Sequence, residues 1–310
     1  MILAEFTLGT AQLGLEYGIA NRTGKPARED AIAIVQAAIN AGVRSIDTAR
    51  AYGDAESRIG EALASSAASG VRVVTKLGRL EELDPGAGEQ AVRNAVDASV
   101  TRSMEELRLE KIETLLLHDW AHHTAFDGAV WRGLLEHRAS GRISGLGGSV
   151  YEPEEAAAAL ADPTVSHIQI PLNVLDWRWR AAGVDGLARE RPDVTIHARS
   201  ALLQGLLAAD SDVWQRVQGA DPRPYLDKLD RLAAEFGRRS RADLCLAYVR
   251  SQPWVSSVVV GVETRGQLDE NVGLFRQPRL SADECARIEQ EVTGATEDLL
   301  NPSRWKVTRR

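Results

Sequence analysis

The stretch that decides the fold is RSIDTARAYG (44–53), a short β-rich run that ends in reactive side chains. Two similar runs follow it, at 71–76 (VRVVTK) and at 113–119 (ETLLLHD). A barrel of parallel strands collects its chemistry at the carboxyl ends of its strands. Four side chains lie at or just past the ends of these runs: Asp47, Tyr52, Lys76 and His118. An acid, a phenol, an amine and an imidazole brought to one rim predict a proton-transfer site.

Short β-rich runs alternate with helical patterns along the whole chain. The strand candidates are 6–11, 43–49, 71–76, 113–119, 143–150, 166–173, 194–200 and 255–261. The clearest helical patterns lie at 28–42, 154–161 and 225–237. Strict alternation implies parallel strands joined by helical crossovers, and no GxGxxG motif follows the first run to suggest a doubly wound sheet. We therefore predict an α/β fold: a (β/α)8 TIM barrel over residues 1–310 as a single domain, with an extra C-terminal helix at 281–294.

The composition limits the class of protein. The 310 residues carry a net charge of −7, whereas nucleic-acid binding would need a basic patch or stripe. No run approaches the ~18–20 apolar residues that span a bilayer, and the first residues lack the features of an export signal. The two cysteines, Cys245 and Cys285, have no metal-ligand spacing and suit a reducing compartment. We expect a soluble, cytoplasmic monomer or small homo-oligomer whose partner is a small molecule, not a nucleic acid or a membrane.

The chemistry of the four side chains follows from their proximity. A tyrosine hydroxyl normally titrates near ~10, and an ammonium group within a few ångströms favours the phenolate form. Lys76 can supply that charge, and Asp47 can pair with Lys76 and keep it protonated. His118 can orient an oxygen that is bound near the Tyr52 hydroxyl. Because none of the four side chains can supply a hydride, reduction of a carbonyl at this site requires a cofactor.

Several motifs resemble those of one enzyme superfamily. The segment DTARAYGDAESRIGEAL (47–63) resembles the Asp-Thr-Ala-x-x-Tyr-Gly-x-x-Glu signature of the aldo-keto reductase superfamily, and TKLG and LLLHDW resemble its lysine and histidine blocks. Further blocks follow in the family's order: GLGGSV (145–150), IQIPLNVLD (168–176), ARSALLQGLL (198–207) and VVVGVETRGQLDEN (258–271). The resemblance covers nearly the whole chain. The opening LGTAQLGLEYGIANRTGK and the RSALLQGLL stretch are similar to a bacterial branch of the superfamily.

The resemblance implies an activity. It points to an NAD(P)H-dependent oxidoreductase that interconverts an alcohol and a carbonyl, which would be an aldehyde, a ketone or a keto group of a sugar or secondary metabolite. The implied catalytic residues are Asp47, Tyr52, Lys76 and His118, with Tyr52 as the general acid/base. Apart from the resemblance, Tyr17, Trp120 and Trp177 are candidate contacts for the substrate, and Trp120 would either line the substrate mouth or lie in an exposed loop. No metal is implied: the nearby His122 and His123 lack the HExxH spacing.

The residues that the resemblance assigns to the cofactor come from many parts of the chain. Those near the nicotinamide are Ser149, Gln169 and Arg199. Those of the pyrophosphate loop are Ser200, Leu202 and Gly205. Those of the adenosine end are Gly261, Glu263, Arg265, Gln267, Glu270 and Asn271. Gly9, Thr10 and Asp47 complete the set.

Three departures from the family pattern bear on the cofactor. Val150 stands where an asparagine usually follows the serine, and Arg199 stands where many relatives stack an aromatic ring. Glu263 stands where many NADPH-using relatives have an arginine, and a carboxylate there would repel a ribose 2′-phosphate. Arg265 lies two residues further on and offers a replacement charge. NADP(H) is therefore favoured on family grounds, and NAD(H) is the alternative.

The substrate pocket would be built by four connections, at 14–26, 119–127, 174–184 and 202–224. Arg22, Arg178 and Arg180 offer charge for an anionic or polyhydroxylated substrate. Trp177 and Trp179 would either form an aromatic wall or pack the loop against the barrel.

Two other functions compete with the oxidoreductase. A lysine at a barrel strand end can form a Schiff base, so a lyase or aldolase acting through Lys76 is one alternative. A non-catalytic barrel that senses a cofactor is the other, because a fold does not by itself imply an activity.

Overall fold

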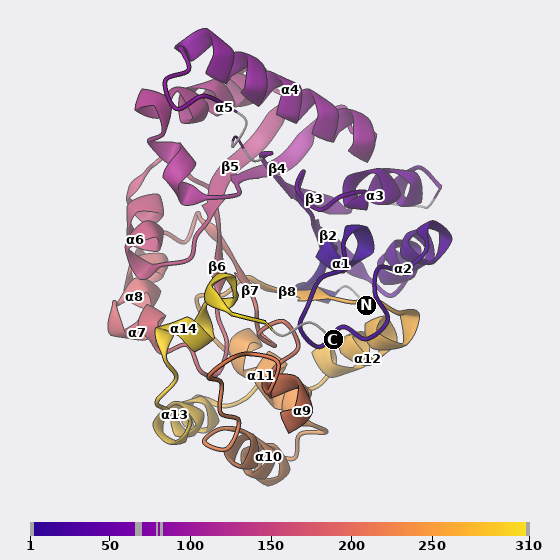
Figure 1. Ribbon diagram of the computed structural model, residues 1–310, viewed down its shortest axis with the longest axis vertical. Coiled ribbons are helices and arrows are strands. Elements are labelled where there is room, and N and C mark those ends of the chain that lie inside the picture. Colours follow the sequence, from indigo (N-terminus) through magenta and orange to yellow (C-terminus); the bar gives the residue numbers. More distant parts are fainter. Residues whose placement is uncertain (1–2, 66–69, 79, 81–82, 308–310) are drawn as a thin grey trace.

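The computed structural model describes residues 3–65, 70–78, 80 and 83–307, and within them eight parallel strands close into a barrel (Figure 1). Each strand pairs with the next one in sequence, and the last pairs with the first. The strands are β1 (Leu3–Gly9), β2 (Val43–Asp47), β3 (Arg72–Lys76), β4 (Ile112–Leu117), β5 (Ile143–Ser149), β6 (His167–Pro171), β7 (Thr195–Arg199) and β8 (Ser257–Gly261). The predicted (β/α)8 barrel is confirmed.

Helices surround the strands in Figure 1. The longer ones are α2 (Arg28–Asn40), α3 (Ala55–Ala64), α4 (Glu89–Leu107), α5 (Ala129–Ala139), α6 (Pro153–Ala161), α8 (Val184–Glu190), α10 (Leu226–Glu235), α11 (Arg241–Arg250), α12 (Arg265–Phe275) and α13 (Ala282–Glu291). Short turns are α1 (Ala11–Gly14), α7 (Arg178–Ala181), α9 (Ser211–Trp214), α14 (Glu297–Leu300), η1 (Trp120–His123), η2 (Phe126–Gly128) and η3 (Pro302–Arg304). Among the described residues, no helix is both long and apolar enough to cross a membrane.

The sequence signals for helix ends agree with the structure. Gly42 follows the end of α2 with φ of 101°, a left-handed conformation that glycine adopts without a steric penalty. The extra C-terminal helix is α13, and Ser281 caps it by accepting a hydrogen bond from the backbone N–H of Glu284. The Glu284 side chain accepts in return from the Ser281 N–H, which completes a capping box.

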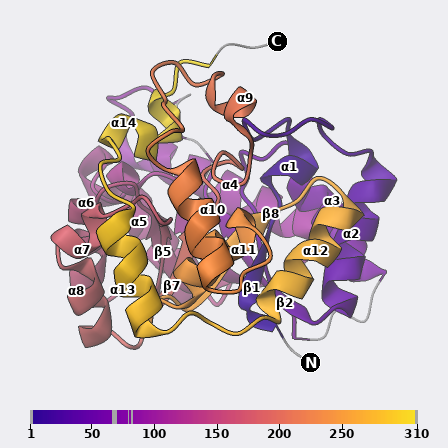
Figure 2. The same ribbon diagram turned by 90° about the horizontal axis from the view of Figure 1, so that it is seen from below.

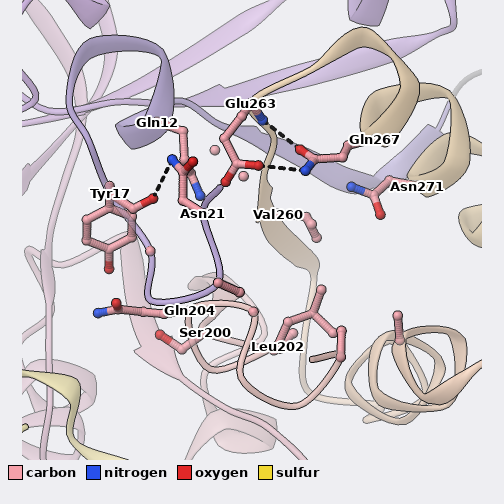
Figure 3. A pocket seen from close by; sticks show the side chains of 18 of the residues that line it. Gln12, Tyr17, Asn21, Ser200, Leu202, Gln204, Val260, Glu263, Gln267 and Asn271 are labelled. Atoms are coloured by element: carbon pink, nitrogen blue, oxygen red, sulfur yellow. Dashed lines mark hydrogen bonds between the residues drawn. The ribbon is translucent and has the colours of Figure 1, made fainter. Parts of the chain in front are cut away.

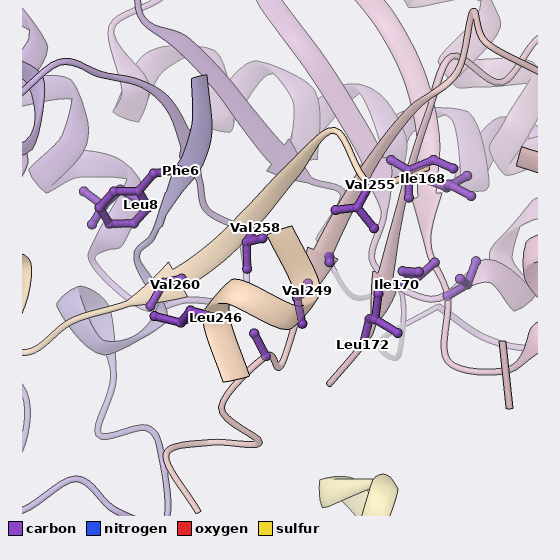
Figure 4. Close-up of a cluster of buried hydrophobic side chains, with 14 of the residues drawn as sticks. Phe6, Leu8, Ile168, Ile170, Leu172, Leu246, Val249, Val255, Val258 and Val260 are labelled. Carbon is purple, nitrogen blue, oxygen red and sulfur yellow. The ribbon is translucent and has the colours of Figure 1, made fainter. Parts of the chain in front are cut away.

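The strands alternate between an apolar outer face and a polar inner face. The outer face packs against the helices and is fully buried (Figure 4); it includes Phe6, Leu8, Ile168, Ile170, Val258 and Val260. Phe6 stacks on Phe275 of α12 with the ring centroids 4.7 Å apart. The alternate positions of the same strands are polar and also buried, and they include Thr7, His167, Gln169, His197 and Ser257. The barrel interior therefore carries many polar side chains, with apolar ones such as Val74 and Leu116 among them, while the main apolar core lies between barrel and helices.

The two long connections, 14–26 and 202–224, meet at one rim of the barrel, as predicted. The backbone N–H of Ala20 donates to the Gln204 carbonyl (3.4 Å), and Arg216 donates to the Ile19 carbonyl (3.2 Å). Figure 2 shows α9, which belongs to the second connection, at one end of the barrel, where α14 also lies. That end is the carboxyl end of the strands.

Candidate active site

A cavity of about 720 Å³ opens at the carboxyl ends of the strands. Its lining includes Asp47, Tyr52 and Gln169. It extends along the 200–209 loop to Glu263 and the start of α12 (Figure 3). Of the residues assigned by resemblance, those lining it are Gly9, Thr10, Tyr17, Asp47, Tyr52, Gln169, Arg199, Ser200, Leu202, Gly205, Gly261, Glu263, Gln267, Glu270 and Asn271. The structure therefore brings most of these residues to one elongated cavity.

Asp47 and Lys76 form a buried ion pair at the ends of β2 and β3. The Lys76 ammonium donates to both carboxylate oxygens of Asp47 (2.8 Å each) and to the Thr48 carbonyl (2.9 Å). The Lys76 side chain is 1% exposed and the Asp47 side chain is 4% exposed. Burial lowers the pKa of Lys76, and the charge and hydrogen bonds of Asp47 oppose that shift. A cation is thus fixed in a site where water does not screen it.

Tyr52 and His118 complete the group of four. The Tyr52 ring centroid lies 5.1 Å from the Lys76 nitrogen. The Tyr52 and His118 rings meet edge to face, with their centroids 5.7 Å apart. The turn that carries Tyr52 approaches α1 so closely that a side chain at Gly14 would lie 1.8 Å from the Tyr52 carbonyl. Glycine at position 14 therefore allows the tyrosine to reach this place.

Gln169 links the ion pair to the cavity. Its amide nitrogen donates to Asp47 (2.7 Å), while its amide oxygen is buried and has no partner among the described residues. Gln169 lies beside Ser149 in the pairing of β6 with β5. Ser149 is 3% exposed and does not line the cavity. The amide oxygen of Gln169 is an acceptor available to a bound molecule.

The loop after β7 contains several residues in the left-handed region and several backbone N–H groups without a hydrogen-bond partner among the described residues. Its residues in the left-handed region are Ser200 (φ 60°), Leu203 (φ 48°), Gln204 (φ 55°) and Gly205 (φ 85°). Within the described residues, no hydrogen bond uses the backbone N–H of Leu202, Gln204 or Gly205. Successive N–H groups in such turns form concavities that bind anions. A side chain at Gly205 would lie 2.7 Å from Ala20, so glycine also lets the two long connections meet.

Arg199 lies under Tyr151 at the end of β7. Its guanidinium is 4.2 Å from the Tyr151 ring centroid and donates to the Val150 carbonyl (3.1 Å) and to Ser200 Oγ (3.4 Å). Val150 is fully buried, and it stands where many relatives have an asparagine. It therefore offers this rim only its backbone carbonyl and no side-chain amide. The arginine at position 199 is therefore held by its neighbours and still lines the cavity.

The end of β8 and the start of α12 form the other side of the cavity. A side chain at Gly261 would lie 2.2 Å from the amide oxygen of Gln12, so glycine makes room for Gln12. Glu263 follows, and its carboxylate accepts from the Gln267 amide at 2.6 Å (Figure 3). Arg265 points elsewhere: it lies 3.0 Å from Asp269, is 63% exposed and does not line the cavity.

Two of the aromatic residues assigned to the substrate lie outside this cavity. Trp120 is 8% exposed and stacks on His123 (centroids 4.5 Å apart), and a side chain at Gly148 would meet its ring at 2.4 Å. Trp177 is 43% exposed and donates to the Ala295 carbonyl (3.2 Å) beside a separate, smaller depression. Tyr17 lines the main cavity.

The 174–184 connection is more buried than its polar sequence indicates. Trp179 is fully buried, which agrees with the packing alternative for this tryptophan. Arg178 is 6% exposed and pairs with Asp176 (2.9 Å) and Glu152 (2.7 Å). Arg180 pairs with Glu289. Neither Arg178 nor Arg180 lines the main cavity, and both are paired with carboxylates of the same chain. Arg22 lines the cavity and lies 3.3 Å from Asp212.

The cavity also contains residues that the sequence did not single out. They are Gln12, Asn21, Gln204, Asp210, Asp230, Ser240 and Arg241. Arg241 lies 2.7 Å from Asp230 and 3.4 Å from Asp210. Gln12, Asn21 and Gln204 lie in or beside the two long connections, which was the available signal. Arg241 begins α11, and nothing in the strand pattern distinguishes it.

Comparison with known proteins places the chain among oxidoreductases. A family model described as the aldo/keto reductase family matches residues 5–292. L-glyceraldehyde 3-phosphate reductase from Escherichia coli O157:H7 is 26% identical over 301 residues, which covers 86% of this chain and 84% of the relative. D-threo-aldose 1-dehydrogenase from a Pseudomonas species is 29% identical over 299 residues, covering 85% and 89%. An aldo-keto reductase from a Mycobacterium species is 33% identical over 148 residues, which is 46% of this chain and only 50% of the relative.

A solved structure shares the fold. The holo form of an aldo-keto reductase from Bacillus halodurans superimposes with a TM-score of 0.74 at 21% identity. The superposition covers 92% of this chain and 91% of that one. At this identity the likeness concerns the architecture, in agreement with the closed barrel described above.

Proposed function

The chain belongs to the aldo/keto reductase family, and from that membership we propose that it interconverts a carbonyl and an alcohol with an NAD(P) cofactor and with Tyr52 as general acid/base. One observation carries the proposal: the Tyr52 ring lies 5.1 Å from an ammonium group that is itself buried and paired with Asp47. A cation fixed in this way stabilises the phenolate relative to the phenol. Tyr52 can therefore give and retake a proton at a substrate oxygen.

The four residues divide the work of proton transfer. Tyr52 donates its proton to the carbonyl oxygen during reduction and accepts it back during oxidation. Lys76 keeps its position because its three N–H groups all point to Asp47 and the Thr48 carbonyl. His118, edge-on to Tyr52, orients the same substrate oxygen. A positioned acid contributes roughly 10²–10⁴-fold to the rate, and donors aimed at the developing alkoxide add to it.

The residues of the cavity fit a nicotinamide dinucleotide, which supplies the hydride when bound. The unpaired amide oxygen of Gln169 suits the carboxamide of the nicotinamide. The N–H groups of Leu202, Gln204 and Gly205 suit the pyrophosphate. The remaining part of the cavity, along Glu263 and Asn271, is left for the adenosine.

The substrate proposed is a small polar aldehyde or sugar. Two relatives are named for a phosphorylated aldehyde and for an aldose. Arg22 and Tyr17 line the mouth of the cavity and offer polar contacts to such a molecule. A cytoplasmic location is proposed with it, on the grounds that Cys245 and Cys285 are both free and buried.

The Schiff-base alternative loses support from the surroundings of Lys76. A nucleophilic lysine must be neutral and reachable by the substrate. Lys76 is 1% exposed and does not line the cavity. Its ammonium group donates three hydrogen bonds, to both carboxylate oxygens of Asp47 and to the Thr48 carbonyl. Borohydride added in the presence of a carbonyl substrate would reduce any imine on Lys76 to a stable adduct. We expect Lys76 to remain unmodified, and an adduct on Lys76 would revive this alternative.

Replacement of Tyr52 tests the proposed function directly. Tyr52→Phe removes the proton donor without removing the ring, so kcat should fall by roughly 10²–10⁴-fold. Cofactor affinity, followed by quenching of tryptophan fluorescence, should change little. Tyr225→Phe is the matched control, since this hydroxyl donates to the remote Gly294 carbonyl. A Tyr52→Phe enzyme with normal turnover would refute the assignment.

A further inference from the structure

The carboxylate of Glu263 lies at the wall of the cavity and is held there by Gln267. Its Oε2 accepts from the Gln267 amide (2.6 Å), and its backbone N–H donates to the oxygen of the same amide (2.7 Å), as Figure 3 shows. Thr264 caps α12 by accepting from the Gln267 N–H (3.2 Å), which fixes the residue that holds Glu263. The other carboxylate oxygen, Oε1, accepts no hydrogen bond from any described residue. The cavity wall thus offers a fixed anionic acceptor.

No described cation balances this carboxylate. Arg265, the nearest arginine in sequence, is turned away from the cavity and paired with Asp269 at 3.0 Å. Of the arginines that do line the cavity, Arg241 is held by Asp230 and Asp210. Arg22 lies beside Asp212, and Arg199 beneath Tyr151. A dianion placed near Glu263 would therefore meet uncompensated negative charge.

The start of α12 offsets that charge only in part, because two of the N–H donors of this segment are already used. The N-terminal end of a helix attracts anions through its unpaired N–H groups. Here the Gln267 N–H is already bonded to Thr264, and the Glu263 N–H that precedes the helix is bonded to Gln267. The side chains of the segment thus occupy donors that a phosphate would otherwise use.

We propose that Glu263, held by Gln267, makes this enzyme select NAD(H) over NADP(H). The inference rests on the proposed function, because it assumes that the dinucleotide lies with its adenosine along β8 and α12. In that position the free oxygen of Glu263 accepts a hydrogen bond from a ribose hydroxyl, as carboxylates do in other dinucleotide sites. A 2′-phosphate would instead bring like charges together. Arg265, which the sequence offered as a replacement charge for a 2′-phosphate, lies outside the cavity.

Direct titration tests this selection without turnover. We expect NADH to bind at least about 10–100-fold more tightly than NADPH, since juxtaposed like charges at a binding site cost several kcal/mol. The same order should appear by calorimetry with 5′-AMP and 2′,5′-ADP, which probe the adenosine end alone. Raising the salt concentration should narrow the difference, because ions screen charges at this half-buried site.

Variants at position 263 identify the residue responsible. Glu263→Gln removes the charge and keeps the shape, so it should improve NADPH binding at least about tenfold and weaken NADH binding slightly. Glu263→Arg should reverse the preference. Glu105→Arg, an exposed substitution on α4 with the same change of charge, should leave the ratio unaltered. Arg265→Gln should also leave it unaltered, because that side chain faces solvent.

The outcomes separate the selection from the underlying function. Tighter binding of NADPH by the natural chain, or an unchanged ratio in Glu263→Gln, would overturn the role of Glu263 while the oxidoreductase stands. Loss of NADPH binding in Arg265→Gln would assign the phosphate to Arg265 and also overturn it. If neither dinucleotide bound at all, the proposed function would fall, and this inference with it.

Discussion

Two layers of polar side chains lie inside the barrel and share strand β6, but one of them holds charged groups and the other holds neutral ones. At the carboxyl ends, Gln169 of β6 bonds to Asp47, which pairs with Lys76. Two residues closer to the amino ends, His167 of β6 and His197 of β7 meet with their ring centroids 4.2 Å apart. Both layers are buried, with every one of these side chains at most 5% exposed.

The difference between the layers is the presence of a carboxylate. Burial, together with smaller effects of the positive charges of Arg72 and Lys76, lowers the pKa of His197 to about 3. Burial likewise lowers the pKa of His167 well below its ordinary value, with smaller effects from His197 and Lys76. Burial also lowers the pKa of Lys76, but Asp47 opposes the shift there. In this barrel, a buried base without a nearby carboxylate, such as His167 or His197, is neutral. A buried base remains charged where a carboxylate is hydrogen-bonded to it, as Asp47 is to Lys76.

The largest expected effect comes from breaking the upper layer. Asp47→Asn leaves the Lys76 ammonium buried without its counterion, and such a change typically costs about 3–5 kcal/mol of stability. Turnover should be lost as well, because the lysine no longer has a fixed place beside Tyr52. Urea unfolding and steady-state kinetics on the same preparation measure both.

The double variant Asp47→Asn/Lys76→Met separates the two losses. It removes the unpaired charge, so most of the stability should return while turnover stays absent. If Asp47→Asn alone proved as stable as the natural chain, Lys76 would be neutral in it, and the comparison between the layers would fail.

An intermediate effect is expected from the lower layer on acidification. The two histidines are neutral in the native state, whereas in the unfolded chain they take up protons below about pH 6.5. The unfolded state therefore binds more protons, so stability is full above that pH and falls as the pH drops toward 3. For His197 the loss between pH 8 and pH 5 should be about 2 kcal/mol.

Replacement of one ring isolates that contribution. His197→Phe keeps a planar ring but cannot be protonated, so its unfolding free energy should decline less steeply between pH 7 and pH 5. At pH 8 the two proteins should differ only by the fit of the new ring. An identical slope in both proteins would mean that His197 is protonated in the native state, against the neutrality assigned to the lower layer.

Sequence reasoning succeeded where a signal is local and repeated. Each strand is a β-rich run with a helical pattern on either side. Eight such strand–helix units are the number that forms a closed parallel barrel, so the barrel was predictable. Asp47, Tyr52, Lys76 and His118 were predictable too, because strand ends converge on one rim by the geometry of the fold. The structure links the four in a series of contacts, from Asp47 to Lys76, from Lys76 to Tyr52 and from Tyr52 to His118.

The sequence did not predict the places of charged side chains whose direction depends on their partners in the folded chain. Arg178 looked like a rim charge, yet Asp176 accepts from it and from the Trp179 indole, which draws the segment inward. Arg265 looked like a phosphate ligand, yet on α12 it faces Asp269 one turn further on and away from the cavity. The direction in which each side chain of a helix points depends on the residue at which the helix begins. In α12 the N-cap is Thr264, and a sequence predicts such a position only to within a residue or two.

The smallest expected effect concerns Gln169, the residue that joins the upper layer to the cavity. Gln169→Leu keeps the volume but removes an acceptor that faces the proposed nicotinamide, so cofactor affinity should fall by about 5–10-fold, equivalent to one net hydrogen bond. Stability should change little, because Lys76 still satisfies both oxygens of Asp47. Gln252→Leu, at a similarly buried glutamine whose amide donates to the Tyr248 carbonyl, is the matched control and should bind cofactor normally. If Gln169→Leu bound cofactor normally but lost several kcal/mol of stability, Gln169 would belong to the ion pair and not to the cofactor site, and the upper layer would be as self-contained as the histidines below it.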